Sequence, residues 1–158
     1  MHDDQDKSNE AAQERLIAAG RAVHAAFDQA DEAVAGKLGI NRSDLRCLNA
    51  LEHGALTPTE IGRRLGLSSG AVTTLIDRLD RSGFVHRQPS PTDRRSSVVA
   101  LRPDAFQRIG PLYRAIASEL VKEFEQLSER NRAAAVTYFE RLASAVSRGA
   151  AADSGRDA

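Results

Sequence analysis

The sequence predicts a mainly α-helical fold that carries one small β-hairpin. Apolar residues recur at spacings of three and four along most of the chain, which is typical of helices with one buried face. Two short runs, 84–88 and 97–101, break that pattern and are rich in strand-forming residues. Aromatic residues make up only 4% of the 158 residues, and the many Ala and Leu residues favour packed helices over a sheet sandwich.

Two short helices joined by a tight turn are predicted in the middle of the chain. Thr57 is a good N-cap, Pro58 suits the first helical position, and Glu60 completes a capping box. Gly66 supplies the left-handed residue that ends the first helix, and Ser68 caps the second. The apolar residues of the second helix fall at i, i+3, i+4 and i+7, and they are Val72, Leu75, Ile76 and Leu79.

The polar side of this second helix carries short side chains where a solvated helix usually carries Glu and Lys. A helix that lies in the major groove of DNA needs such a slim face, because donors, acceptors and methyl groups must reach the base edges. An ordinary exposed helix rich in Ser and Thr is the alternative. The residues predicted to contact DNA from this helix are Ser68, Ser69, Gly70, Thr73, Thr74 and Arg78, with Arg78 on phosphate. Arg63 and Arg64 of the preceding helix are also predicted to contact phosphate.

The two strand-like runs form a hairpin with a basic tip. The segment between them contains two prolines and an Asp, which predicts a loop. Arg94 and Arg95 lie at its tip, and arginine suits a narrow, negative minor groove. We expect Asp93 to pair with Arg95 and aim it into that groove, while Arg94 faces phosphate or solvent. A mobile tip that adds only general affinity is the alternative. Two helices followed by such a hairpin make a winged helix-turn-helix.

At these residues the chain resembles the multiple antibiotic resistance regulator (MarR) family. The resemblance covers roughly residues 10–148, and it implies a homodimer that regulates transcription, most often as a repressor, from a pseudo-palindromic site on double-stranded DNA. The motifs that look like the reading helix are Leu65-Gly66-Leu67-Ser68, Val72-Thr73, Asp77-Arg78-Leu79 and Gly83-Phe84-Val85. Asp93-Arg94-Arg95 looks like the wing signature of the family, Asp-x-Arg.

The same resemblance implies release from DNA by a small aromatic or phenolic effector. In the family such ligands bind between the dimerisation helices and the winged core. The candidate lining residues are His24, Phe27, Arg46, Phe106 and Tyr113. His24 and Arg46 would meet a carboxylate, or else are solvated surface residues. Phe27 and Phe106 have a plain core role as their alternative.

Long helices are predicted on both sides of the winged core, which spans 41–102. One covers 10–38, and two more lie within 103–148. Their apolar stripes are too long for one small domain to cover, so we expect them to form a dimer interface. Residues 1–9 and 149–158 are polar or small and are expected to be disordered.

Two local features of these flanking segments lead to further expectations. Ser43 is the expected N-cap of a short helix whose apolar positions are Leu45, Leu48 and Leu51. Gly110-Pro111 lies inside the helix that Pro103 opens, and a proline there should kink or split it.

Charge is distributed unevenly although the net charge is zero. From Ile61 to Arg102 there are eight Arg and three Asp, a net charge of +5, whereas residues 1–36 carry a net charge of −5. Affinity for phosphate depends on where charge lies, so the basic winged segment is compatible with a nucleic-acid partner.

No pattern typical of an enzyme, a cofactor site or a metal site stands out. The four histidines are far apart and lack paired ligands, and no phosphate loop or nucleophile elbow is present. The single Cys47 excludes a disulfide framework and, with a polar N-terminus, predicts a cytoplasmic protein. Two other functions stay open: a winged helix that only contacts proteins, and a regulator that senses oxidants through Cys47.

Overall fold

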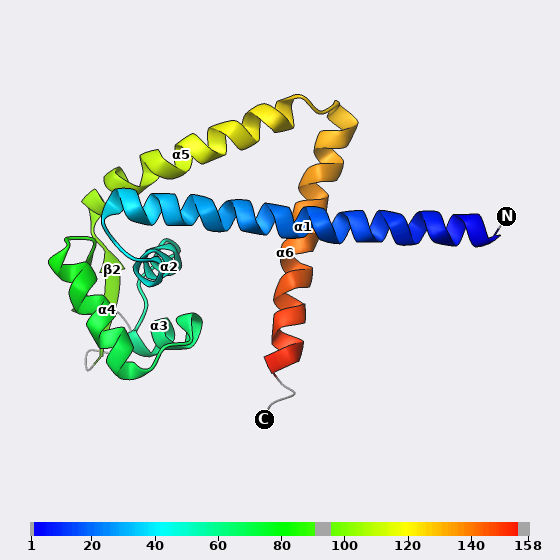
Figure 1. The fold of residues 1–158 in the computed structure, drawn as a ribbon. Coiled ribbons are helices and arrows are strands. Elements are labelled where there is room, and N and C mark those ends of the chain that lie inside the picture. The colour runs from blue at the N-terminus through cyan, green and yellow to red at the C-terminus, as the bar shows by residue number, and fades with distance from the viewer. Residues whose placement is uncertain (1, 91–95, 155–158) are drawn as a thin grey trace. The chain divides into compact units, whose positions relative to one another are not determined.

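The computed structural model describes residues 2–90 and 96–154, and the chain divides into two compact units. The first unit ends at Tyr113 and the second begins at Arg114, inside one helix. Among the described helices, none combines the length and apolarity needed to cross a membrane. The elements in order are α1 (His2–Leu38), α2 (Arg42–Leu51), α3 (Pro58–Leu65), α4 (Ser69–Arg81), β1 (Val85–Pro89), β2 (Ser97–Leu101), α5 (Pro103–Glu125) and α6 (Glu129–Ser154) (Figure 1).

The predicted class, mainly α with one hairpin, is confirmed. The strands β1 and β2 pair antiparallel, with Val85 opposite Leu101 and Pro89 opposite Ser97. Leu56, just before α3, adds an isolated bridge to Val99 of β2. This bridge fastens the hairpin to the helices through two backbone hydrogen bonds of 2.8 and 3.0 Å.

The core of the first unit lies where α2, α3, α4 and the base of the hairpin meet. All four predicted apolar positions of α4 are buried, and so are the three leucines predicted for α2. Phe84, which joins α4 to β1, is the largest fully buried side chain. The other members of this core include Cys47, Leu56, Ile61, Leu65, Val85, Val99 and Ala105.

Both predicted ends of α3 and the predicted N-cap of α4 are confirmed. Thr57 and Glu60 form the reciprocal capping box, and the Thr57 N–H donates to Glu60 Oε2 at 2.7 Å. This donation, with a second from the Thr57 hydroxyl, lowers the pKa of Glu60. Gly66 adopts φ 71°, in the left-handed region that glycine tolerates, and Ser68 caps α4.

The predicted cap of α2 is wrong: the N-cap is Asn41, not Ser43. The Asn41 side chain accepts from the Asp44 N–H at 2.9 Å, and Asp44 Oδ2 accepts from the Asn41 N–H at 3.3 Å. Asp44 at the third helical position therefore completes a capping box that Ser43 has no acid to form. Helix α2 begins at Arg42 as a result.

The outer helices extend further than the sequence analysis predicted. Helix α1 already includes residues 2–9, whose aspartates lie at the helix N-terminus, where negative charge is favoured. Helix α6 continues through residues 149–154, which contain three alanines, the strongest helix formers. Helix α5 is not split at Pro111, which lies inside one continuous helix.

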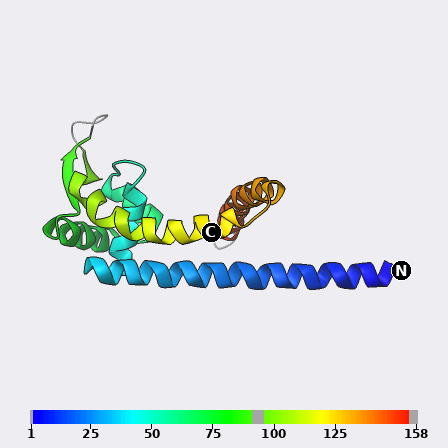
Figure 2. The same cartoon turned by 90° about the horizontal axis from the view of Figure 1, so that it is seen from above.

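Only the C-terminal end of α1 is buried in the described chain. Figure 2 shows α1 as one continuous helix, and Val34 and Ala35 near its C-terminus are buried. Further toward the N-terminus the predicted stripe is exposed at Leu16, Val23 and Phe27. The first unit therefore leaves a row of apolar side chains on α1 without cover.

Cys47 is a buried core residue. Its side chain is inaccessible to solvent, and burial, with a smaller effect from the nearby Asp44 carboxylate, raises the pKa of the thiol to about 12. Because the thiolate is the reactive form, this environment suppresses oxidation and disulfide exchange. The redox-sensor alternative finds no support in this environment.

We therefore expect Cys47 in the folded protein to react very slowly with a thiol reagent at pH 8, and fast once guanidinium unfolds the chain. The reason is the small thiolate fraction, about one in ten thousand for a pKa of about 12, compared with about one in four for an unperturbed thiol. Release of the chromophore from an aromatic disulfide reagent measures both rates. Labelling of the folded protein as fast as the unfolded control would contradict this.

A second prediction concerns the contact between α3 and α4 at Gly62. A Cβ at this position would lie 3.1 Å from the Leu67 carbonyl oxygen and 3.3 Å from Val72 Cγ2. Gly62→Ala should therefore lose the ~1 kcal/mol that alanine gains over glycine in a helix, and destabilise the protein by about 1 kcal/mol.

Gly36→Ala is the matched control, since Gly36 is an exposed helical glycine whose added Cβ would meet nothing within 4 Å. It should stabilise by up to ~1 kcal/mol in urea unfolding. Equal gains for the two variants would show that the helices do not approach closely at Gly62.

Candidate nucleic-acid interface

The face of α4 opposite the core is exposed and slim, as predicted. Ser69, Gly70, Thr73 and Thr74 are all exposed, while the stripe of Val72, Leu75, Ile76 and Leu79 is buried. The Thr73 hydroxyl donates to the Ser69 carbonyl at 3.0 Å, and the Thr74 hydroxyl donates to the Gly70 carbonyl at 3.1 Å. These bonds fix the side-chain rotamers, so the two threonines present a defined edge.

A shallow groove of about 370 Å³ runs beside this face, between α3 and α4. Arg63 lines it from α3, opposite Ser69 and Thr73 of α4. Arg64 turns the other way, and its Nη1 donates to the Ala50 carbonyl of α2 at 3.4 Å. Of the two α3 arginines predicted to contact phosphate, Arg63 is the one beside the exposed face of α4.

Arg78 is paired with a buried acid, although its own side chain is 39% exposed. Its Nε lies 3.1 and 2.9 Å from the two oxygens of Asp44, and its Nη2 lies 2.6 Å from Asp44 Oδ1. This hydrogen bonding raises the pKa of the guanidinium. Asp44 is a residue that sequence reasoning missed, because the two residues are 34 positions apart. An aspartate at the third helical position signals a cap, and nothing in the sequence signals its second partner.

Two further acids on α4 pair with arginines of the hairpin region. Asp77 accepts from Arg87 of β1 at 3.2 Å, and Asp80 accepts from Arg102, just after β2, at 3.1 Å. Arg102 also donates to the Val85 carbonyl at 2.8 Å. Arg102 thereby ties β1 to α4.

The predicted wing residues Asp93, Arg94 and Arg95 lie outside the described residues. The strands that lead to them are described, and β1 and β2 remain paired as far as Pro89 and Ser97. The Ser90 N–H donates to the Ser96 carbonyl at 3.0 Å, beyond the last strand pair.

A larger pocket of about 430 Å³ lies between α2 and the start of α5. Phe106 and Tyr113, two of the five candidate effector residues, line it. The Tyr113 hydroxyl donates to Asp31 of α1 at 3.0 Å and accepts from Asn49 of α2 at 3.2 Å. Burial raises the pKa of Tyr113, so the phenol keeps its proton. The remaining lining residues are Leu48, Asn49, Glu52, His53, Leu101, Ile109 and Gly110.

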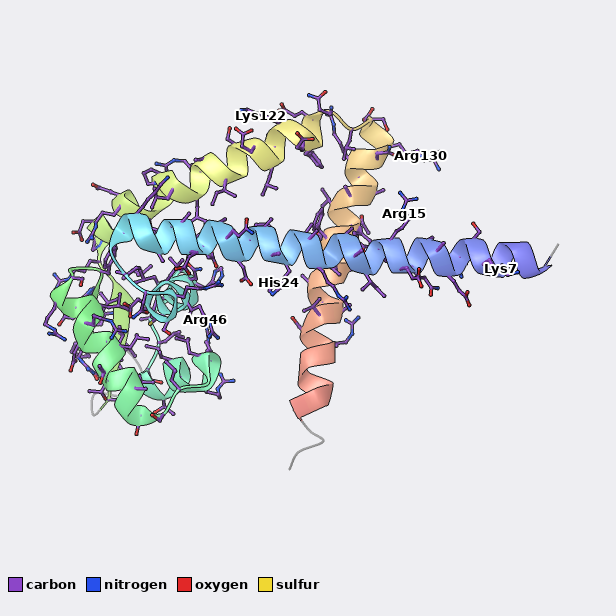
Figure 3. All side chains as sticks on the ribbon, in the orientation of Figure 1. Lys7, Arg15, His24, Arg46, Lys122 and Arg130 are labelled. Atoms are coloured by element: carbon purple, nitrogen blue, oxygen red, sulfur yellow. The ribbon has the colours of Figure 1, made fainter. Side chains whose placement is uncertain are left out.

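The other three candidate effector residues do not line this pocket. Figure 3 labels His24 on α1 and Arg46 on α2, and both are exposed. The His24 side chain is 80% exposed and lies 3.6 Å from Asp28 one turn away. Phe27 is exposed on α1. Sequence reasoning missed Glu52 and His53, which follow α2 in the turn and carry no helical periodicity.

No metal site is apparent within residues 2–90 and 96–154. In this part of the chain no three His, Cys, Asp or Glu side chains come together in a group that would hold an ion.

Sequence comparison relates most of the winged core to a known family. The family model described as MarR family matches residues 38–96. The HTH-type transcriptional regulator YcgE of Bacillus subtilis is 35% identical over 99 residues, which cover 60% of this chain and 64% of YcgE. The chain thus spans just under two thirds of the length of this relative.

Solved structures share the fold. The transcriptional regulator Tm0710 of Thermotoga maritima matches with a TM-score of 0.64 at 22% identity, over 86% of this chain and 94% of that one. A MepR variant of S. aureus bound to an oligodeoxyribonucleotide matches with a TM-score of 0.57 at 17% identity, over 83% and 97% of the two chains. The sequence match of residues 38–96 and the shared fold together support a winged helix-turn-helix protein of the MarR type.

Proposed function

We propose that this protein is a sequence-specific regulator of transcription that binds double-stranded DNA through α4. The observation that carries the proposal is the exposed face of α4, where four small or hydroxyl-bearing residues stand clear of a rigid core. A helix of this kind fits the major groove, in which each base pair presents a distinct pattern of donors, acceptors and methyl groups. The oligonucleotide bound to the MepR variant supports a DNA partner for this fold.

The proposed roles divide the exposed residues into reading and holding groups. Ser69, Gly70, Thr73 and Thr74 face base edges, and the threonine methyls meet thymine methyls. Ser68 caps α4 and brings the helix N-terminus toward a phosphate, which the helix dipole favours. Arg63 and Arg64 hold phosphate, with Arg63 better placed beside the α4 face.

The wing completes the proposed contact. Arg95 enters the minor groove, aimed by Asp93, and Arg94 takes phosphate or solvent. The support for this is the sequence signature and the described hairpin, whose strands are tied to α4 by Asp77–Arg87 and Asp80–Arg102. These two ion pairs anchor the described part of the hairpin beside α4.

A homodimer is the second part of the proposal. Apolar side chains are exposed on α1 at Leu16 and Val23, and on α6 at Phe139 and Val146. Exposed apolar surface on long helices marks protein interfaces, and a second copy of the chain is the partner that a pseudo-palindromic site requires. The two reading helices would then lie ~34–36 Å apart on one face of the duplex.

The third part is relief of repression by a small aromatic or phenolic molecule. The pocket of about 430 Å³ lined by Phe106 and Tyr113 has the size and mixed lining of a small-molecule site. Its position supports a regulatory role, because Tyr113 joins α1, α2 and α5 through hydrogen bonds to Asp31 and Asn49. A phenolic ligand would compete for these bonds.

A winged helix that only contacts proteins is the competing function, and salt separates the two. Binding to DNA phosphates releases counterions, so the association constant falls steeply as salt rises. We expect a labelled duplex pool to bind with that negative slope and a selection from random sequence to yield a palindromic consensus. A pool that binds without salt dependence or enriches nothing would favour the competing function.

The roles proposed for Thr73 and Arg63 predict opposite behaviour of two variants. Thr73→Ser removes the methyl group and keeps the hydroxyl that bonds Ser69, so it should change the preferred base at one position per half-site, by about 1–3 kcal/mol. Arg63→Ala should weaken all sequences alike and flatten the salt slope by ~1. Titrations on the selected duplex and on its single-base variants measure both.

Arg148→Ala, which removes an exposed charge from α6, is the control for net charge and should leave preference and slope unchanged. If Thr73→Ser and Arg63→Ala shift base preference equally, the division into reading and holding residues is wrong.

The proposed dimer predicts a mass in light scattering of twice the 17.1 kDa chain at micromolar concentration. Phe139→Asp places a charge on the exposed apolar face of α6 and should shift the mass toward one chain. Arg141→Asp is the control, since position 141 lies about 200° round the helix from position 139. A single-chain mass for the wild-type protein would contradict the proposal.

A further inference from the structure

We propose that Asp44 of α2 is a positioning residue for DNA reading, which acts by fixing the direction of α4 through Arg78. This rests on the proposed function, since it assigns the residue that sets how α4 meets DNA. Asp44 does not contact DNA itself, because its side chain is only 1% exposed.

The contact between Asp44 and Arg78 is directional. Both carboxylate oxygens of Asp44 accept from Arg78, at distances between 2.6 and 3.1 Å, and two adjacent guanidinium nitrogens donate. A planar, two-point contact of this kind resists rotation as well as separation. Apolar packing is not directional, so the buried stripe of α4 alone would allow small rotations about the helix axis.

Asp44 is itself fixed by its own helix. The Asn41 N–H donates to Asp44 Oδ2, and the Asp44 N–H donates to Asn41 Oδ1, which closes the capping box of α2. The carboxylate also lies at a helix N-terminus, where the dipole favours negative charge. The same side chain thus caps one helix and orients another, and a small shift of α2 moves both.

The first turn of α2 is also tied to α1. Arg42, the first residue of α2, places Nη2 at 2.6 Å from Asp28 Oδ1 and Nη1 at 3.4 Å from the Asp28 carbonyl. One turn of α2 therefore holds α1 on one side and α4 on the other. The position of the reading helix is set relative to α1, the helix with the uncovered apolar stripe.

The energetics favour orientation over stability as the role of the Asp44–Arg78 pair. Burying a carboxylate costs free energy, and attraction to its partner only approximately offsets that cost. Such pairs therefore add little to stability. Removing one partner leaves the other uncompensated, which makes the geometry sensitive to single substitutions. The pairing of the buried Asp44 with the partly exposed Arg78 of α4 is therefore better explained by the direction that it imposes on α4.

A phosphate contact by Arg78 is the competing role, and Asp44→Asn separates the two. If Arg78 held phosphate, loss of the buried charge would release the guanidinium and tighten binding to every duplex. If Asp44 positions α4, Asp44→Asn keeps the side-chain shape and the cap acceptor but loses the charged pair. The reading face then turns relative to the bases.

We expect Asp44→Asn to weaken binding to the wild-type consensus duplex by about tenfold, equivalent to about 1.4 kcal/mol. Affinity for a scrambled duplex of the same length should change less than about twofold, because contacts with phosphate supply the affinity for such a duplex. Asp104→Asn, which removes an exposed charge from α5, is the control and should change neither affinity. Equal losses on both duplexes, or tighter binding to both, would overturn the positioning role.

Hydrogen exchange tests the same inference without DNA, so it stands apart from the proposed function. In Asp44→Asn the α4 amides of Leu75 and Leu79 should lose about tenfold in protection, while those of Val98 and Val99 in β2 lose less than about threefold. A uniform loss would show a general stability effect and overturn the inference. Absence of any consensus for the wild-type protein would instead reject the proposed function.

If Asp44→Asn does not fold, Arg78→Lys is the variant that tests the same inference. It keeps the charge but makes only a point contact, and should reproduce the selective loss on the consensus duplex. Unchanged discrimination in Arg78→Lys would contradict the need for a two-point contact.

Discussion

Burial of one face of α4 is the constraint on which the rest of the structure depends. Four apolar residues of this helix lie in the core, and the helices and strands around it are arranged to cover them. Because a helix has two sides, burial of this stripe leaves the opposite side exposed. The small residues there cannot contribute to the core, so their positions are available for another partner. One side of this single helix thus packs in the core, and the other side is free for the proposed recognition of DNA.

Polar contacts then determine how that helix is oriented. Three contacts are made by the second half of α4: Arg78 pairs with Asp44 of α2, and Asp77 and Asp80 pair with arginines of the hairpin region. The last two pairs are about half exposed, and exposed ion pairs contribute only ~0–1 kcal/mol each to stability. Their value lies in geometry, because each joins α4 to an element that would otherwise touch it only through apolar side chains.

The sequence predicted the local features of this arrangement well and the long-range ones poorly. The capping box at Thr57, the left-handed Gly66 and the strand pairing follow from residues close together in the chain, and all three are confirmed. The Asp44–Arg78 pair joins residues 34 positions apart, which no periodicity reveals. The α2 cap was misassigned because Ser43 is the more familiar cap signal, whereas the acid that completes the box pairs with Asn41. Only part of the pocket lining could be predicted. Helical stripes indicate Phe106 and Tyr113, but they do not indicate the turn residues Glu52 and His53.

The internal ion pairs also reduce how much of the basic charge of residues 61–102 is available to bind phosphate. Arg78, Arg87 and Arg102 contribute to its net charge of +5, yet all three are paired with acids in the described chain. Three described arginines of this segment have no acid partner: Arg63 and Arg64 on α3, and Arg81, the last residue of α4. The sequence adds Arg94 and Arg95 in the hairpin loop. These arginines lie before and after the residues Ser69, Gly70, Thr73 and Thr74, which are uncharged. Phosphate contacts position a protein on the duplex and base contacts specify the site, so charge beside a neutral reading face is the distribution that a sequence-specific regulator requires.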